Sequence, residues 1–268
     1  MSSLICMAVY DTEENGRSEY TKKTIKSLSE TVDWNKHKLV IINNNSCEET
    51  NEYLKRLLII SDMTGNFGVK IPGVAIVSLS ENVGTARAIN MGLRMRQPEQ
   101  FCIKIDNDVV INHRGWVEEM EEVIARNPTI GIVGLKRKDI NFDANNENPN
   151  YRSKLIQLSH MPGQSWITVE GGGQIMGTCT MFNWRLIDKI GGMKQVGVYG
   201  MDDTLYDLRS QMAGFWNCYL PHINIDHIDT GENPYTQEKH RQAGEAWHEY
   251  TQLHEAYTTG VRSLYEEI

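Results

Sequence analysis

Residues 101–108, Phe-Cys-Ile-Lys-Ile-Asp-Asn-Asp, hold the pattern that decides the fold. Phe101–Ile105 is a short and mostly apolar run, which predicts a strand buried on both faces of a sheet. Three polar residues, Asp106-Asn107-Asp108, follow at the carboxyl end of this strand. Ligands of open α/β sheets bind at that edge. The segment therefore predicts a pair of carboxylates delivered to a ligand site.

The rest of the first half repeats the same alternation of strand and helix. Apolar runs recur at Leu4–Tyr10, Leu39–Ile42 and Gly73–Leu79. The segments between them carry apolar residues at helical spacing. Such alternation is typical of an α/β fold with a mostly parallel central sheet flanked by helices. Further elements are predicted as helices at 51–60, 85–96, 116–124, 184–190 and 202–213, and as strands at 130–135 and 174–182.

The last part of the chain predicts a separate helical extension. From Tyr235 to Leu264, apolar residues recur at steps of three and four, which is the spacing of a long amphipathic helix. We therefore divide the chain into a main domain at residues 1–231 and a C-terminal helical extension at residues 232–268.

Composition excludes several classes of protein. The 268 residues include 27 Lys+Arg and 35 Asp+Glu, a formal charge of −8, with 40% hydrophobic residues. A wholly disordered chain is excluded, and bulk charge argues against tight binding of a polyanion. No apolar run approaches the roughly 18–20 residues of a membrane span. The five cysteines are scattered without a Cys-x-x-Cys pair, which favours reduced thiols and a cytoplasmic location.

Three sets of residues carry candidate chemistry. Asp106 and Asp108 lie on one side of an extended segment, and their hard oxygens suit Mg²⁺ or Mn²⁺. Asp202-Asp203 precedes a predicted helix, where a carboxylate can accept a substrate proton or merely cap the helix. His227 could bind a metal or make a structural hydrogen bond. Each motif has an ordinary structural explanation when it is taken alone.

Taken together and in order, the motifs of residues 4–231 resemble those of nucleotide-sugar-dependent glycosyltransferases with the GT-A fold. The resemblance is strongest to the large inverting family usually numbered two. It rests on Leu4–Tyr10 with Asp11-Thr12, Ile41–Ser46, Asn82–Gly92, Asp106–Asp108, Ile190–Met193, Asp202-Asp203 with Arg209, and His227.

This resemblance implies a role for each matching residue. Asp203 would be the general base and Asp202 a residue that positions the substrate. The cation, Mn²⁺ or Mg²⁺, would be bound by Asp108 and His227, with Asp106 beside them or on the ribose. The donor would contact Tyr10, Asp11, Asn44, Asn82, Gly84, Arg87, Asp106 and Asn107, and the acceptor would contact Trp166, Gly172 and Gly173.

The chain departs from the family pattern at two places. Asn43 and Asn44 stand where members often carry aspartates, which is still compatible with pyrimidine recognition but leaves a preference for uracil open. Asp202 stands where glutamate is commoner. The expected reaction is transfer of a sugar from a nucleoside diphosphate to an acceptor hydroxyl, in one displacement that inverts the anomeric carbon. UDP is the expected nucleoside diphosphate. A divalent ion would stabilise the leaving diphosphate.

Two other functions compete with this one. A sugar nucleotidyltransferase would need a Gly-rich, basic first loop, and residues 10–17 offer only Gly16 and Arg17. A non-catalytic nucleotide-sugar-binding module would be expected to lack part of the acidic set. The acceptor could be a glycan, a small molecule or a hydroxylated base of nucleic acid. The last would suit a basic cluster made of Lys136, Arg137, Lys138, Arg152 and Lys154.

Overall fold

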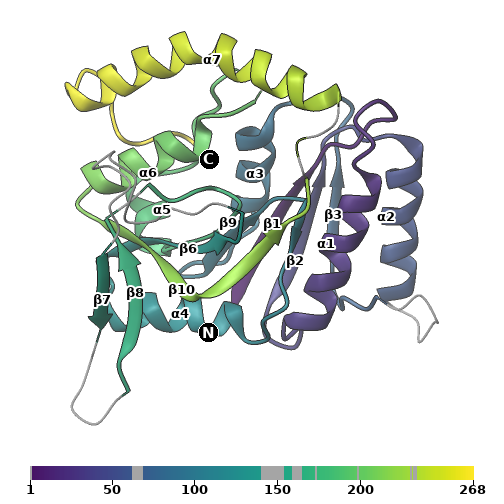
Figure 1. Ribbon diagram of the computed structural model, residues 1–268, viewed down its shortest axis with the longest axis horizontal. Helices are drawn as coiled ribbons and strands as arrows, with labels where there is room; N and C mark the ends of the chain where they lie inside the picture. Colours follow the sequence, from purple (N-terminus) through teal and green to yellow (C-terminus); the bar gives the residue numbers. More distant parts are fainter. Residues whose placement is uncertain are drawn as a thin grey trace.

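A computed structural model describes residues 2–61, 69–139, 154–158, 165–172, 174–197, 199–229, 231 and 234–268. Its described strands form one ten-stranded sheet with helices on both faces (Figure 1). The strand order is β3-β2-β1-β4-β9-β6-β10-β8-β7, with β5 paired to β10 outside this path. The α/β class expected from the sequence is therefore confirmed.

The sheet has a parallel half and a mixed half. In the first half, β2 and β4 both pair in parallel with β1, and β3 pairs in parallel with β2. In the second half, β9 is antiparallel to both β4 and β6. The strands are β1 Ser3–Val9, β2 Lys38–Asn43, β3 Ala75–Ser78, β4 Phe101–Ile105, β5 Val109–Val110, β6 Ile130–Arg137, β7 Lys154–Leu158, β8 Ile167–Gly171, β9 Cys179–Phe182 and β10 Trp216–His227.

Two hydrophobic cores cover the two faces of the sheet. Alternate residues of β1 point to opposite faces, so Ile5 and Met7 join the core under α1, α2 and α4, whereas Cys6 joins the core under α3, α5 and α6. The helices are α1 Ser18–Thr31, α2 Glu48–Ser61, α3 Thr85–Leu93, α4 Trp116–Arg126, α5 Trp184–Ile190, α6 Asp202–Met212 and α7 Pro234–Thr258.

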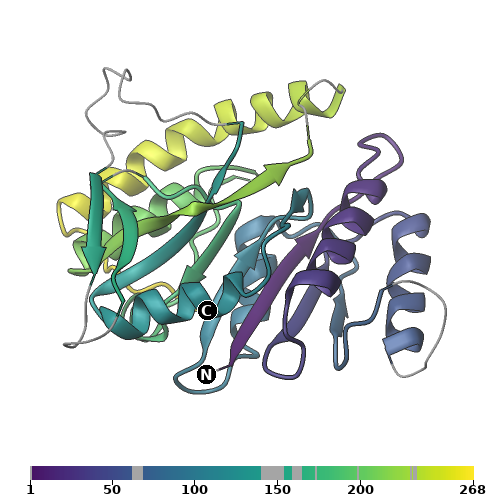
Figure 2. The same cartoon turned by 60° about the horizontal axis from the view of Figure 1, so that its bottom comes forward.

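The C-terminal helix α7 docks on the same body. Its Ala246, Leu253 and Tyr257 pack with Leu205 of α6 in a third buried cluster. Figures 1 and 2 show α7 lying across the edge of the sheet at which β10 ends. After α7 the chain runs back to the end of α5, where Glu266 forms a β-bridge with Gly191. The domain boundary at 231/232 remains a prediction.

Several sequence predictions differ from the observed elements; the helix predicted at 85–96, for example, ends at Leu93. The strand expected at 174–182 begins only at Cys179, because residues 174–178 bond instead to the Tyr219 hydroxyl and to the N–H of Asp106 after β4. Helix α7 ends at Thr258, before the predicted end at 264. Strand β10 was not predicted. It contains Pro221, which lacks a backbone N–H, and its pairing with β6 shifts register between Leu220 and Asn224. An apolar helix of membrane-spanning length is absent from the ranges described above.

Candidate active site

The carboxyl ends of the parallel strands open into one cleft of about 600 Å³. Tyr10 follows β1, Asn44 follows β2 and Asp106 follows β4, so register places the three at one edge of the sheet. The second half of the chain adds the start of α6 and the end of β10. Residues expected from the sequence that line the cleft are Tyr10, Asn44, Asn82, Asp106, Asn107, Asp108, Asp202, Asp203 and His227.

Asp108 and His227 face each other because β5 and the end of β10 pair antiparallel. The His227 Nε2 lies 3.3 Å from Asp108 Oδ2, and the Arg17 guanidinium donates to the same oxygen at 2.5 Å. Arg17 also bonds to the buried Asp229. Burial would raise the pKa of Asp108, but His227 and Arg17 outweigh it and hold this pKa well below its usual value. Asp108 is therefore a carboxylate.

The chemistry of this pair fits a divalent cation. Asp108 Oδ1 and His227 Nδ1 are buried and have no hydrogen-bond partner in the part of the chain that the structure describes. Carboxylate oxygen and imidazole nitrogen suit Mn²⁺, and the carboxylate also suits Mg²⁺. Among the described residues no group of three or more His, Cys, Asp or Glu could hold the ion. A cation bound here needs further oxygens, such as those of a diphosphate or of water.

Lys104 connects the two acidic motifs, and sequence reasoning missed it. Its side chain is buried, and the ammonium donates to Asp106 Oδ1 at 2.8 Å and to the Gly177 carbonyl. Burial would lower the pKa of Lys104, but the charges of three aspartates outweigh it and raise this pKa above its usual value. Those aspartates are Asp106, Asp202 and Asp203. An ionisable residue inside an apolar strand was the available signal.

Asp202 and Asp203 are adjacent in sequence but differ in environment. Asp203 accepts backbone N–H groups from Gly177 and from Thr204, each at 2.8 Å. Asp202 is 5% exposed, and its Oδ2 lacks a hydrogen-bond partner within the described ranges. Burial and the charge of Asp203 raise the pKa of Asp202 to about 7. Asp203 is thus held in orientation, whereas Asp202 is partly protonated near neutral pH.

The amides of Asn44 and Asn82 form one side of the cleft. Asn44 donates to Asn82 Oδ1 at 2.7 Å and accepts from the Val83 N–H at 2.9 Å. The same Asn82 oxygen accepts from the Gly84 N–H. Gly84 has φ +88°, a backbone conformation that favours glycine at the residue before α3.

Three residues expected at the donor, Asp11, Gly84 and Arg87, do not line the cleft. Asp11 is completely buried and accepts from Thr21, Thr50 and Asn107, so it braces the loops beneath the site. Arg87 is exposed because the neighbouring Ala86 and Ala88 fill the core under α3. Gly84 likewise shapes the wall and is not part of its lining.

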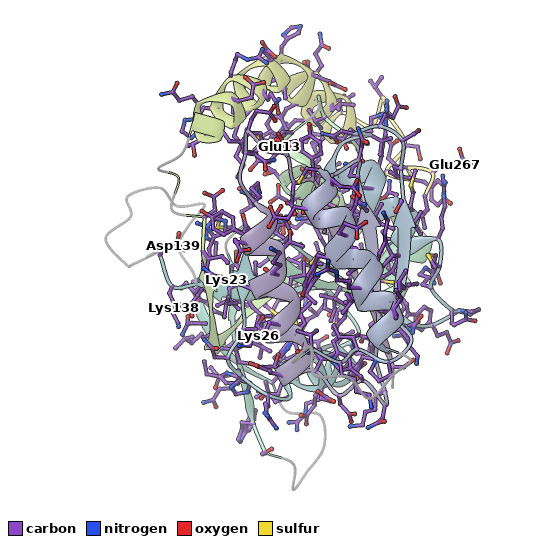
Figure 3. All side chains as sticks on the ribbon, turned by 90° about the vertical axis from the view of Figure 1, so that its right-hand side faces the viewer. Glu13, Lys23, Lys26, Lys138, Asp139 and Glu267 are labelled. Atoms are coloured by element: carbon purple, nitrogen blue, oxygen red, sulfur yellow. The ribbon has the colours of Figure 1, made fainter. Side chains whose placement is uncertain are left out.

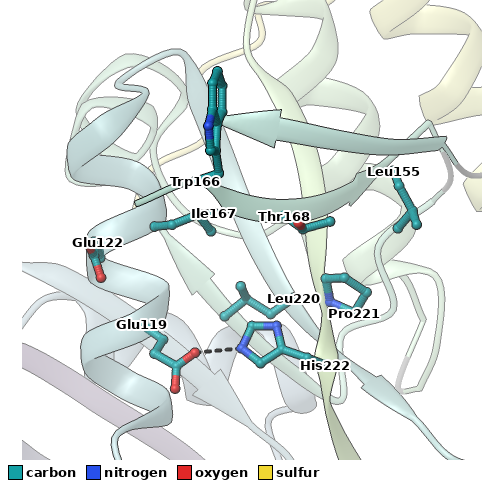
Figure 4. A pocket seen from close by; sticks show the side chains of 9 residues that line it. All are labelled: Glu119, Glu122, Leu155, Trp166, Ile167, Thr168, Leu220, Pro221 and His222. Atoms are coloured by element: carbon teal, nitrogen blue, oxygen red, sulfur yellow. Dashed lines mark hydrogen bonds and ion pairs between the residues drawn. The ribbon is translucent and has the colours of Figure 1, made fainter. Parts of the chain in front are cut away.

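The expected acceptor residues lie elsewhere. Trp166 is 63% exposed and borders a separate hollow with Glu119, Thr168 and His222 (Figure 4). Five residue steps along extended chain, roughly 17 Å, lead from it to Gly171 at the far end of β8. Gly172 borders a further hollow beside Thr204 and Tyr250. Gly173 lies outside the described residues.

Two other motif residues are structural. Arg209 is buried and donates to the carbonyls of Ile190, Gly192 and Leu264, so it holds the Gly-Gly turn and the C-terminal segment. Asn90 bonds to both backbone groups of Met193, each at 2.8 Å. Sequence reasoning also missed several residues that line the cleft: Arg17, Tyr199, Tyr235, Glu238, Lys239 and Gln242. The last four come from α7, and nothing in their spacing places them at a site.

The fold and this cleft define a glycosyltransferase of the GT-A class. Residues 5–190 match the family model described as glycosyl transferase family 2. Because this match covers more than half of the chain, the protein belongs to that family. A comparison with curated protein sequences finds no match.

Solved structures share the fold at low sequence identity. A mannosyltransferase from Pyrobaculum calidifontis, in complex with GDP-Man and Mn²⁺, has a TM-score of 0.62 at 16% identity, over 86% of this chain and 57% of that one. S. aureus TarS with UDP-GlcNAc has a TM-score of 0.55 at 13% identity, over 86% and 61%. GalNAc-T7 with UDP, GalNAc and Mn²⁺ has 0.61 at 12%, over 85% and 44%. The chain thus spans less than two thirds of these proteins.

Proposed function

We propose that this glycosyltransferase is metal-dependent and inverting, and that it moves a sugar from a nucleoside diphosphate, UDP in the leading case, to an acceptor hydroxyl. The observation that carries the proposal is the convergence of Asp108, His227 and Asp203 on one cleft from distant parts of the chain. A single cavity can then hold a leaving group and an attacking group together, as one displacement requires.

The donor would lie along the strand ends. Asp108 and His227 would hold Mn²⁺ or Mg²⁺ together with the diphosphate. The bound cation would supply charge stabilisation to the leaving phosphate. Asp106 is paired with Lys104 and is assigned to the ribose or to a metal-bound water. Tyr10, Asn44 and Asn82 would contact the nucleoside. A nucleotide-type donor is supported by the similar structures, whose ligands are GDP-Man, UDP and UDP-GlcNAc.

Asp203 is assigned as the proton acceptor. Two backbone N–H bonds fix its carboxylate, which leaves lone pairs on both oxygens for an acceptor hydroxyl. Asp202, with its raised pKa, is assigned to position the substrate. Three of the five cations of the basic cluster are paired, Lys136 with Glu170, Arg137 with Asp139 and Lys138 with Asp226, while Arg152 lies outside the described residues. This pairing favours a glycan or a small molecule over a nucleic acid as the acceptor. Cytoplasmic location remains a prediction from the cysteine pattern.

The proposal is tested by binding and then by turnover. UDP, GDP, CDP and ADP are each titrated into the protein with and without Mn²⁺, while the melting temperature is followed. We expect UDP with Mn²⁺ to raise it most. Hydrolysis of the matching nucleotide sugar and the anomeric configuration of the product are then read by NMR. Absence of any metal-dependent shift, or retention of configuration, contradicts the proposal.

A further inference from the structure

The first turns of α7 form one wall of the cleft. Tyr235, Glu238, Lys239 and Gln242 of this helix line the cavity with Asp106 and Asp108. The region that the sequence predicts to be an extension therefore borders the same space as the proposed donor site.

Lys239 joins a chain of charges that leads to Asp108. Its ammonium lies 2.7 Å from Asp229 Oδ2, the oxygen to which Arg17 also donates. Arg17 in turn bonds to Asp108. The Asp229 carboxylate therefore lies between two cations, Lys239 and Arg17.

The surroundings of Lys239 allow its ammonium to move while its partner keeps a cation. The ammonium lies 5.7 Å from the Tyr199 ring centroid and 5.4 Å from that of Tyr235, within cation–π range. If it turns from Asp229 toward the cavity, Arg17 still bonds to that carboxylate, although it shares its charge with Asp108. Loss of the Lys239 contact therefore does not leave Asp229 without any partner.

A diphosphate entering this cleft meets five carboxylates. Asp106, Asp108, Asp202, Asp203 and Glu238 line it, so cations must balance both these groups and the phosphates. Lys104 is fixed by Asp106 and the Gly177 carbonyl, and Arg137 is bonded to Asp139. Lys239 instead shares its carboxylate partner with Arg17, on a long side chain with three donors.

We propose that Lys239 binds the diphosphate of the nucleotide donor, which makes α7 part of the donor site. The inference rests on the proposed function, because it deepens the same cleft. It assigns the helix a role in ligand affinity as well as in packing. The nucleoside part of the ligand contacts the opposite side, around Asn44 and Asn82, and is independent of Lys239.

The test compares a nucleotide with its nucleoside. UDP and uridine are titrated calorimetrically into the wild type, Lys239→Met and Lys239→Arg, each with Mn²⁺. Lys26→Met is the matched control, since Lys26 is an exposed lysine of α1 that does not line the cleft. We expect Lys239→Met to weaken the binding of UDP about tenfold or more and to leave the binding of uridine unchanged. Lys239→Arg should restore most of the lost affinity, and Lys26→Met should bind UDP like the wild type.

The outcomes separate the two proposals. Wild-type affinity for UDP in Lys239→Met overturns the role of Lys239 while the proposed function stands. Equal losses for UDP and uridine also overturn it, because they indicate disturbed packing of α7. If the wild type itself binds no nucleoside diphosphate in the panel above, the proposed function fails and this inference fails with it.

Discussion

The ammonium of Lys104 lies 2.8 Å from the carboxylate of Asp106, two residues further along the chain. Residues i and i+2 of extended chain point to the same side, so this pair follows from the geometry of β4 and its end. The same ammonium bonds to the carbonyl of Gly177, whose N–H bonds to Asp203. One buried cation thus ties the aspartates after β4 to the acidic pair that begins α6.

Replacing Lys104 should cost more stability than replacing an exposed lysine. In Lys104→Met the carboxylate of Asp106 loses its partner; because this carboxylate is 35% exposed, water screens part of the loss, and we expect a cost of about 1–3 kcal/mol. Lys26→Met is the control, because Lys26 projects outward from α1 (Figure 3). The measurement is urea denaturation at pH 7. A loss below about 1 kcal/mol, equal to that of Lys26→Met, contradicts the ion-pair role.

The raised pKa of Asp202 predicts how stability changes with pH. The folded protein keeps this proton up to a pH of about 7, whereas an unfolded aspartate releases it near ~4. The folded state binds more protons between these values, so this group's contribution to stability falls as the pH rises from about 4 to 7. Asp202→Asn removes the free-energy cost of ionising this buried side chain. The variant should therefore melt higher than the wild type at pH 8, by on the order of several degrees.

The control for that measurement is the exposed Glu267→Gln, which should melt like the wild type at both pH values. At pH 4 the difference between Asp202→Asn and the wild type should nearly vanish, because both side chains are then uncharged. A difference that stays constant with pH would show that the pKa of Asp202 is not raised.

The parallel half of the fold was predictable from the sequence, and much of the second half was not. Strand β4 and its aspartates were located because an unbroken apolar run ends in acidic residues. Strand β10 mixes polar residues with Pro221, and its pairing is set by distant partners in β6 and β8. Lys239 was missed for a similar reason, because only the docking of α7 on α6 carries it to the cleft. Periodicity reports local structure, whereas such placements depend on tertiary packing.

Asp203→Asn should separate catalysis from binding. An amide keeps one acceptor oxygen for the backbone and the shape of the side chain, but it cannot take a proton from an acceptor hydroxyl. We expect the rate of sugar transfer to fall by about 10²–10⁴, while UDP binding in the presence of Mn²⁺ stays within about twofold. Asp202→Asn should lose far less activity. Equal losses in the two variants would show that the proton acceptor has been assigned to the wrong residue.

Substitution of a metal ligand should weaken binding of the donor, in addition to any effect on the chemical step. Asp108→Asn leaves Arg17 bonded to Asp229 but takes away the carboxylate that faces His227. We expect its Mn²⁺ affinity, measured by electron paramagnetic resonance with UDP present, to fall at least about tenfold. The wild type treated with a chelator should show the same loss of UDP affinity as Asp108→Asn. If chelation leaves UDP affinity unchanged, the cation is not part of the donor site, and Arg17 and Lys239 would be the groups that hold the diphosphate.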